Sequence, residues 1–384
     1  MTRSASTIES TCWEKLSAPN PSGWDEGMYF ITLVDDFGRS SKTSVYLPKF
    51  DTNKSLGALI CLHGAGSVGE TLIDNFKQFA NQTYMAVICP TAKAPPEGKN
   101  NLDLAGLFSK KFNHPRWTHS QNGFPLRALK WARSELAIDP NRCALLGYSM
   151  GAISAWALCM KFPYLFSSLI VINGALSIWE RFGPDREIDA LLPNLAQVPI
   201  KIIHGSTDEH IPIKLHLDAY ERLRAIGHKN VEFIEIQNGQ HALESLNIGM
   251  NLTLMKKLSC FLLESYREEW PDHICHYATE NHYGRSHWAS ISDINFGVTG
   301  FIKAKIENRN SIFIKTQYVN KLELYLSREL INTGDFKIVV NGVEEPLHFI
   351  SDAEMISSDF LSIEGRRIVS EQTISFDFVN KKWM

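Results

Sequence analysis

The sequence predicts an α/β protein, with a mostly parallel sheet covered by helices on both faces, followed by a small antiparallel β domain of the sandwich type. Between about residues 28 and 264, short apolar runs alternate with longer amphipathic segments, as in a sheet with helical crossovers. After about Trp270 the segments instead alternate apolar and polar residues with period two. A chain of 384 residues is long enough for two such domains.

The first domain is expected to open with an antiparallel hairpin, formed by residues 28–34 and 43–47 around the turn-rich segment DDFGRSSK. Short apolar runs then predict five buried central strands and one strand nearer an edge, at 58–62, 84–89, 143–146, 169–172, 200–203 and 231–236. Helical spacing of apolar residues predicts helices at 124–136, 150–161, 214–226 and 241–264. Because the order is β–α–β, we expect right-handed crossovers within one sheet.

The second domain is predicted from segments of alternating apolar and polar residues that Asn, Gly and Asp separate, at 301–307, 311–316, 321–327, 336–342 and 374–379. The resulting boundaries are an N-terminal extension over 1–27, an α/β domain over 28–268, a linker over 269–287 and a β domain over 288–384. The linker is placed where Pro, His and Tyr are frequent. Two hypotheses for the β domain are formation of a homo-oligomer and binding of a polymeric substrate.

Composition excludes several partners. The 39 basic and 42 acidic residues give a formal charge of −3, which does not predict binding to nucleic acid or to an anionic membrane. No run approaches the roughly 18 apolar residues of a membrane span, and the N-terminus lacks the apolar core of a signal peptide. Seven cysteines, several inside apolar runs, are expected to be reduced. We therefore expect a cytoplasmic location.

The strongest chemical motif is Gly147-Tyr148-Ser149-Met150-Gly151, directly after a predicted strand and before a predicted helix. A chain that turns sharply from strand to helix leaves no room for side chains beside the serine, so glycines flank it and its hydroxyl is presented above the sheet. The start of the helix also favours developing negative charge. Ser149 is the predicted nucleophile.

A serine hydroxyl needs a base within hydrogen-bond reach and a carboxylate that orients this base. Asp208 follows the predicted strand at 200–203, and His241 follows the strand at 231–236. Both therefore lie at the carboxyl ends of strands, where open α/β sheets place their active sites. Glu209 is a second candidate for the acid. Of the other histidines, we interpret His204 as structural because it ends an apolar strand.

The oxyanion of a tetrahedral intermediate needs two backbone donors. The N–H group of Met150, the residue after the nucleophile, is the first. The loop after the strand at 58–62 reads His63-Gly64-Ala65-Gly66, and its small residues let the backbone approach a substrate closely. We assign the second donor to the N–H group of Ala65, with Gly64 and Gly66 as alternatives.

On these motifs, residues 28–264 resemble the α/β-hydrolase superfamily, specifically its dienelactone hydrolase, polyhydroxyalkanoate depolymerase-like and prolyl oligopeptidase-like esterase branch. The matching segments are LGALICLHGAGSVGE, AIDPNRCALLGYSMGA, KFPYLFSSLIVINGA and VPIKIIHGSTDEHIPI with the later NVEFIEIQNGQHAL. The resemblance implies ester hydrolysis, or peptide cleavage in some relatives, without a metal or organic cofactor. Ala152 stands where many relatives have glycine. The first strand is expected near residue 28, which leaves no room for the propeller of full-size oligopeptidases.

The substrate cannot be named from the sequence. An acyltransferase, a thioesterase or a small peptidase could use the same residues, and a non-catalytic binding protein could keep the fold. Long loops near the site suggest lining residues at Trp117 and Trp179, with Tyr148 and His210 closer to the triad. His273, Cys275, His276, His282 and His287 cluster, but their spacing fits no standard zinc site, and no metal is expected.

Overall fold

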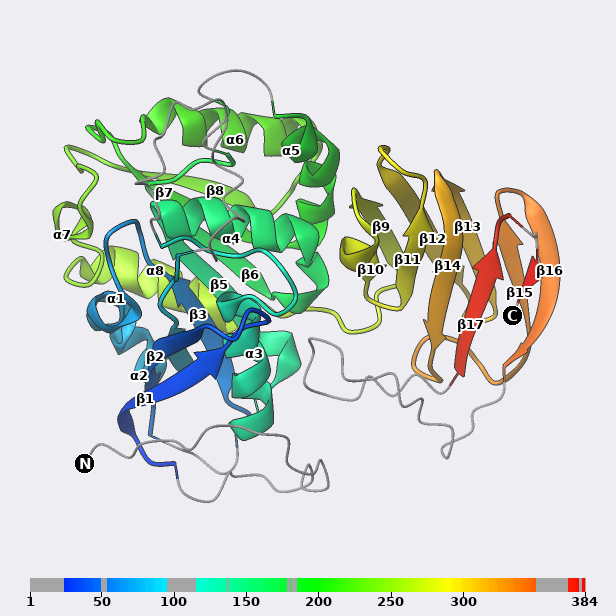
Figure 1. The fold of residues 1–384 in the computed structure, drawn as a ribbon, viewed down its shortest axis with the longest axis horizontal. Helices are drawn as coiled ribbons and strands as arrows, with labels where there is room; N and C mark the ends of the chain where they lie inside the picture. Colours follow the sequence, from blue (N-terminus) through cyan, green and yellow to red (C-terminus); the bar gives the residue numbers. More distant parts are fainter. Residues whose placement is uncertain are drawn as a thin grey trace.

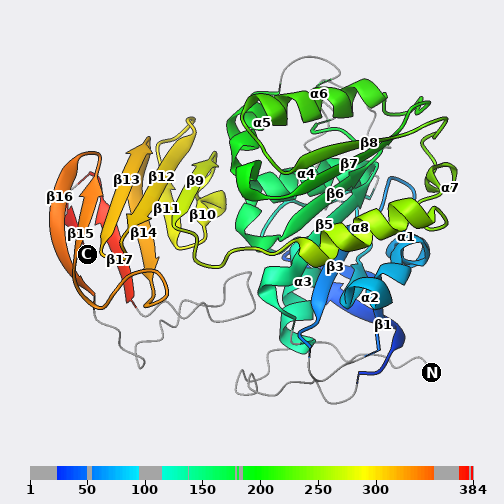
Figure 2. The ribbon, with the colours of Figure 1, turned by 180° about the vertical axis from the view of Figure 1, so that it is seen from behind.

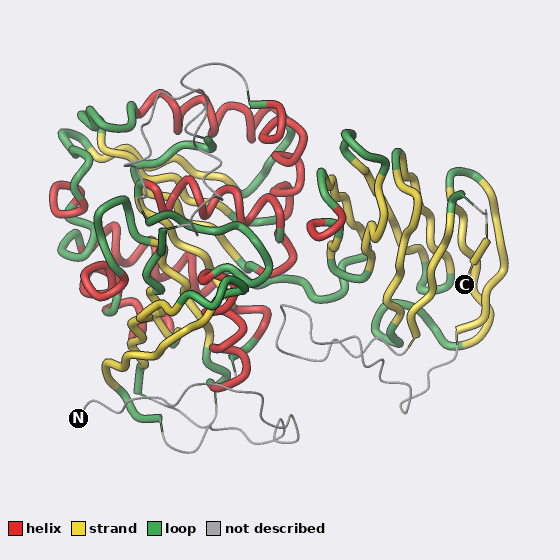
Figure 3. Tube along the Cα trace, viewed as in Figure 1, coloured by secondary structure: helices red, strands yellow, loops and turns green. Residues whose placement is uncertain are grey.

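A computed structural model of the protein describes residues 24–49, 54–94, 115–136, 138–177, 180, 185–349, 372–379 and 382–383. These residues form an α/β unit around an eight-stranded sheet and a second unit with two five-stranded sheets (Figure 1). Figure 3 shows helices surrounding the first sheet, whereas the second unit consists almost entirely of strands. The predicted fold class is confirmed.

The large sheet has the order β1-β2-β4-β3-β5-β6-β7-β8. Its strands are β1 (Gly27–Val34), β2 (Ser40–Leu47), β3 (Gly57–Leu62), β4 (Met85–Cys89), β5 (Cys143–Tyr148), β6 (Ser168–Ile172), β7 (Ile200–Gly205) and β8 (Val231–Ile236). β1 and β2 form an antiparallel hairpin, β2 runs antiparallel to β4, and the six strands from β4 to β8 are parallel. The carboxyl ends of β5, β7 and β8 therefore lie at one edge of the sheet.

Helices cover both faces of this sheet (Figures 1 and 2). Core residues on one face pack with α3 (Phe124–Glu135), α4 (Met150–Lys161), α5 (Arg186–Leu191) and α6 (Ile213–Ala225). Those on the other pack with α1 (Gly69–Phe76), α2 (Gln78–Thr83) and α8 (Leu252–Glu264). Within β3, Ile60 belongs to the first core and Leu59 to the second, because side chains alternate along a strand. No described helix is long and apolar enough to cross a membrane.

A single helix over 241–264 is a wrong prediction. The chain instead forms α7 (Leu243–Leu246) and then α8, with His241 in the loop before both. Asn247 ends α7 in the left-handed conformation, with φ of 51°. Asn251 then caps α8 by accepting a hydrogen bond from the N–H group of Leu254. The apolar spacing continues across the break and hides these two caps in the sequence.

The C-terminal unit contains β9 (His273–Ala278), β10 (Arg285–Ser286), β11 (Ala289–Ile294), β12 (Gly300–Glu307), β13 (Ser311–Gln317), β14 (Val319–Leu326), β15 (Gly334–Val340), β16 (Val343–Phe349), β17 (Gln372–Asp377) and β18 (Lys382–Trp383). Its sheets have the orders β10-β11-β14-β17-β18 and β16-β15-β13-β12-β9, and share one core. One pair departs from the antiparallel expectation: β13 and β15 run parallel. The reason is that β14, between them in the chain, belongs to the other sheet, so β15 returns in the direction of β13.

Residues 269–287, predicted as a linker, contain β9 and β10. β9 pairs with β12 along six residues, and its side chains alternate between outward and buried positions. The side-chain amide of Asn194, in the short helix η4 (Leu192–Gln197), bonds both the N–H and the carbonyl of Tyr277 in β9. Polar residues on the outward side of β9 resembled a linker in the sequence. We propose that the β domain begins near residue 271.

Candidate active site

The predicted nucleophile sits between a strand and a helix. β5 ends at Tyr148 and α4 begins at Met150, so Ser149 alone makes the turn. Its φ of 55° and ψ of −120° lie where residues other than glycine rarely occur. Such a conformation costs about 1–3 kcal/mol and persists only where the surroundings support it. Here the N–H group of Ser149 donates to the carbonyl of Ile172 in β6, at 2.9 Å.

The glycines around Ser149 are required by close backbone contacts. A Cβ atom on Gly147 would lie 2.2 Å from the carbonyl oxygen of Gly151, and one on Gly151 would lie 2.0 Å from that of Leu62 in β3. Atoms cannot approach so closely, and backbone cannot give way as a flexible side chain can. As the motif predicts, a residue with a side chain would not fit at either of these two positions.

The structure brings Ser149, His241 and Asp208 together from three separate loops. Ser149 Oγ lies 2.9 Å from His241 Nε2, and His241 Nδ1 lies 2.8 Å from Asp208 Oδ2. The Asp208 side chain is fully buried, whereas 19% of the His241 side chain is exposed. Nucleophilic catalysis by serine needs this arrangement, in which the base can reach the substrate and the acid lies buried behind the base.

Asp208 is held as a charged carboxylate. Its Oδ1 accepts hydrogen bonds from the N–H groups of His210 and Ile211, each at 2.9 Å. Burial raises the pKa of Asp208, but hydrogen bonds from His204, His241 and Ile211 outweigh this effect and keep the pKa well below its usual value. The carboxylate can therefore stabilise a positive charge on His241.

Asn173 organises the loop that carries His241. Its side-chain nitrogen donates to the carbonyls of Gln240 and His241, at 2.8 and 3.0 Å, while its oxygen accepts from the N–H group of Gly205. Tyr148 also donates to the carbonyl of His241, at 2.8 Å. Asn173 thus connects the ends of β6, β7 and β8. Asn173 was not among the predicted site residues, although an asparagine directly after a buried apolar run was the available signal.

The loop after β3 is fixed by a neutral histidine. His63 Nε2 accepts a hydrogen bond from the N–H group of Ala92, so its proton lies on Nδ1 and is donated to the carbonyl of Gly64, at 2.7 Å. Burial lowers the pKa of His63, in agreement with a neutral ring. The indole of Trp117 donates to the carbonyl of His63 at 3.1 Å.

This loop lies directly beside the serine. A Cβ atom on Gly64 would be 3.0 Å from the Cβ atom of Ser149. Within the described residues, the N–H groups of Ala65 and Met150 donate to no protein acceptor. Two backbone donors next to the predicted nucleophile thus remain available to a substrate oxygen.

A protein-family model described as phospholipase/carboxylesterase matches residues 50–258, more than half of the chain. The chain belongs to the phospholipase/carboxylesterase family. The hydrolase and esterase character expected from the resemblance is thereby confirmed at the level of this family, whereas the narrower branch stays a prediction.

Solved structures with a similar fold include a thermostable esterase, 23% identical over 62% of this chain and 63% of that chain, with a TM-score of 0.43. Another is S-formylglutathione hydrolase from Staphylococcus aureus, 17% identical over 63% of this chain and 98% of that chain, with a TM-score of 0.44. A third is acyl-protein thioesterase 2 from Zea mays, 20% identical over 57% of this chain and 96% of that chain, with a TM-score of 0.38. No curated protein sequence matches significantly.

The predicted lining residues of this family member have different surroundings. The exposed ring of His210 stacks on that of His241, with centroids 4.8 Å apart. Tyr148 is half-buried, and burial raises the pKa of its hydroxyl to about 12. Trp117 is only 5% exposed and anchors the loop after β3. Trp179 lies outside the described residues.

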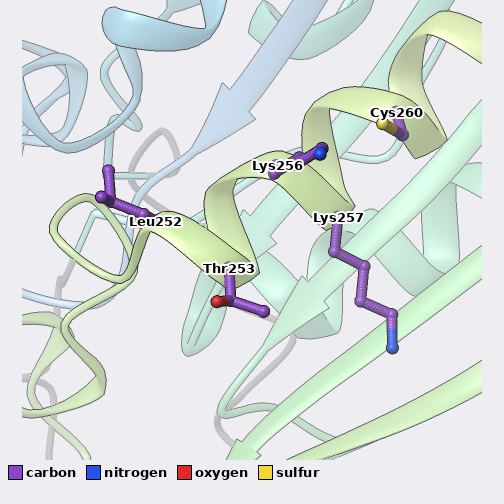
Figure 4. A pocket seen from close by; sticks show the side chains of 5 residues that line it. All are labelled: Leu252, Thr253, Lys256, Lys257 and Cys260. Atoms are coloured by element: carbon purple, nitrogen blue, oxygen red, sulfur yellow. The ribbon is translucent and has the colours of Figure 1, made fainter.

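The described residues place a group of possible metal ligands beside the predicted catalytic residues and a hollow elsewhere, on α8. In the described part of the chain, the side chains close enough to share a metal ion are those of Asp208, His210 and His241, two of which are predicted catalytic residues. A hollow of about 580 Å³ lies on α8 (Figure 4). It is lined by Leu252, Thr253, Lys256, Lys257 and Cys260. None of these belongs to the predicted catalytic residues.

Proposed function

We propose that this member of the family is a serine esterase that hydrolyses a carboxylic ester or thioester through an acyl-enzyme. The observation that carries the proposal is the continuous hydrogen-bonded series from Ser149 Oγ through His241 to Asp208, with separations of 2.9 and 2.8 Å. An isolated serine hydroxyl is a weak nucleophile, and such a series is the arrangement that activates it. The wider family membership agrees with this chemistry.

In the first half-reaction, Ser149 Oγ attacks the carbonyl carbon while its proton passes to His241 Nε2. As the bond from Oγ to carbon forms, the π bond of the carbonyl breaks and its electron pair moves to the carbonyl oxygen, which becomes an oxyanion. Asp208 stabilises the imidazolium. The intermediate then collapses: the bond to the alcohol or thiol breaks, and the leaving group takes the proton from His241. In the second half-reaction, water loses a proton to His241 and attacks the acyl carbon. The bond between that carbon and Ser149 Oγ then breaks, Oγ takes the proton back from His241, and the acid is released.

We assign the oxyanion donors to the N–H groups of Met150 and Ala65. Both are supported because neither N–H group donates to a protein acceptor within the described residues, and because a Cβ atom on Gly64, next to Ala65, would lie 3.0 Å from the Ser149 Cβ atom. Removing one donor of such a pair typically costs about 2.7–4 kcal/mol of transition-state stabilisation. The hydrogen bonds around His63 keep the loop rigid, which such preorganised donors require.

The proposal is tested with a series of p-nitrophenyl esters from acetate to decanoate. Wild type is expected to turn over at least one ester, and Ser149→Ala none. Ser154→Ala, a control in the helix that follows Ser149, should turn over the same ester at the wild-type rate. A serine-directed fluorophosphonate should label wild type and Ser154→Ala only. Turnover that survives in Ser149→Ala would overturn the serine mechanism.

Other outcomes separate the alternatives. Labelling of Ser149 without ester turnover would favour an acyltransferase, a thioesterase or a peptidase with the same triad. Absence of both turnover and labelling would favour a non-catalytic binding protein. We also propose a cytoplasmic location, supported by the free thiols of the six cysteines in the described part of the chain.

A further inference from the structure

Two buried histidines lie behind the acid of the proposed triad. His204, at the end of β7, and His216, in α6, are both completely buried. Their Nδ1 atoms are 2.8 Å apart. On one side, the indole of Trp156 in α4 donates to His216 Nε2 at 3.3 Å. On the other side, His204 Nε2 lies 2.9 Å from the carbonyl of Ile211 and 3.4 Å from Asp208 Oδ2.

The direction of these hydrogen bonds follows from the chemistry of the end groups. An indole N–H group can only donate, so His216 Nε2 must be the acceptor. Burial holds the pKa of His216 well below its usual value, so its ring is neutral and its single proton lies on Nδ1. That proton points to His204 Nδ1, which therefore accepts. The proton of a neutral His204 is then on Nε2, facing Ile211 and Asp208.

The opposite tautomer of His204 is unfavourable at this position. It would place a proton on each of two Nδ1 atoms only 2.8 Å apart. It would also turn the lone pair of Nε2 toward the Ile211 carbonyl and the Asp208 carboxylate, neither of which can donate. Unpaired polar groups in a buried site are costly, so the network stabilises one proton arrangement.

We propose that His204 and His216 are positioning residues, which hold the loop and the carboxylate of Asp208 in the orientation that His241 needs. At one end Trp156 donates to His216 and so fixes the direction of every hydrogen bond in the series. At the other end the N–H group of His204 points to Asp208. The inference rests on the proposed function, because Asp208 matters for turnover only if His241 acts as the base. It adds a positioning role to the interpretation of His204 as a structural histidine that ends a strand.

Two contacts explain how the pair acts on Asp208. His204 donates toward Oδ2, the oxygen that also accepts from His241. It also donates to the carbonyl of Ile211, whose own N–H group bonds Oδ1 of the same carboxylate. His204 therefore restrains both the side chain of Asp208 and the loop that holds it.

The test compares His216→Asn with His216→Leu. Both side chains branch at Cγ and have similar shapes, but only asparagine can donate to His204 Nδ1. We expect His216→Leu to lower kcat by about 10- to 100-fold, within the range that misplacement of a catalytic group produces, with little change in KM. His216→Asn should recover most of the lost kcat. Equal kcat in the two variants would overturn the proposal.

A second measurement does not depend on turnover. Long-range proton–nitrogen NMR correlations should find the proton of His204 on Nε2 in wild type and in both variants, because Ile211 and Asp208 offer only acceptors. The nitrogen shift of Nδ1 should show an accepted hydrogen bond in wild type and in His216→Asn, and its loss in His216→Leu. A proton on Nδ1 of His204 in wild type would overturn the proposal even if both variants failed to fold. If wild type hydrolysed no ester, the proposed function would fail, whereas the tautomer would still show whether His204 directs its proton toward Asp208.

Discussion

The close packing of Ala152 against Gly174 leads to a quantitative prediction about the stability of the protein. Ala152 is in the first turn of α4, and Gly174 follows β6. A Cβ atom on Gly174 would lie 2.5 Å from the Cβ atom of Ala152. Carbon atoms in contact prefer about 3.5–4.0 Å, so Gly174→Ala creates an overlap of roughly 1.0–1.5 Å. Gly174 does not have a positive φ, so this contact is the source of the strain.

The overlap should lower the free energy of unfolding by a measurable amount. Overpacking of this kind costs about 1–3 kcal/mol, since α4 or the loop after β6 must move. Each kcal/mol lowers the Tm of a domain of 150–250 residues by about 2–4 °C. Ala152→Gly alone should cost about 1 kcal/mol, the difference between the two residues in a helix. In the double variant one methyl group replaces the other, and the overlap disappears.

The assay is scanning calorimetry of the wild type, both single variants and the double variant. We expect the double variant to be more stable than the sum of the single effects by at least about 1 kcal/mol, as contacting residues are coupled. Ile302→Val, in the core of the C-terminal unit, identifies any separate transition of that unit. Additive losses, or a Gly174→Ala variant as stable as wild type, would refute the steric argument.

Three further predictions follow from the same structure. Ser149→Gly should raise the free energy of unfolding by about 1 kcal/mol relative to Ser149→Ala, because glycine relieves the strain of a positive φ; urea unfolding tests this, and equal stability would contradict it. Burial lowers the pKa values of three histidines near the junction of the two units to about 3, 4 and 3, for His119, His276 and His287 respectively. Below pH 6.5 the unfolded chain binds protons that the folded chain does not, so stability should fall as the pH drops from 6.5 toward 4, by up to about 1.4 kcal/mol per pH unit for each histidine. A Tm that is constant between pH 7.5 and 5 would argue against it. Trp117→Phe removes the hydrogen bond to the His63 carbonyl and should cost about 1 kcal/mol of stability, with lowered kcat on the best ester; unchanged kcat would separate this loop from the oxyanion site.

The strands of the α/β unit could be predicted from local sequence patterns, whereas the short helices α1, α2 and α5 were not predicted. Fully buried parallel strands are continuous apolar runs, and β3, β5, β6 and β7 were expected close to their observed positions. The nucleophile motif carried its own structural context, since a strand must end and a helix must begin around Ser149. The break between α7 and α8 was harder to predict from the sequence, because the apolar spacing of the two helices continues through Asn247.

The sequence by itself therefore determined the fold class, the order along the chain of the eight strands in the α/β unit, and a serine, an aspartate and a histidine in the chain order of α/β-hydrolases. Only the tertiary structure decided that Asn173 joins three loops, that β9 belongs to a sheet, and that His216 reaches His204. The physical reason is distance along the chain: periodicity and turn chemistry act over a few residues, whereas these hydrogen bonds join segments that meet only after the sheet has formed. The direction of the hydrogen bonds in the buried histidine pair likewise depends on tertiary contacts, with Trp156 at one end and Ile211 at the other.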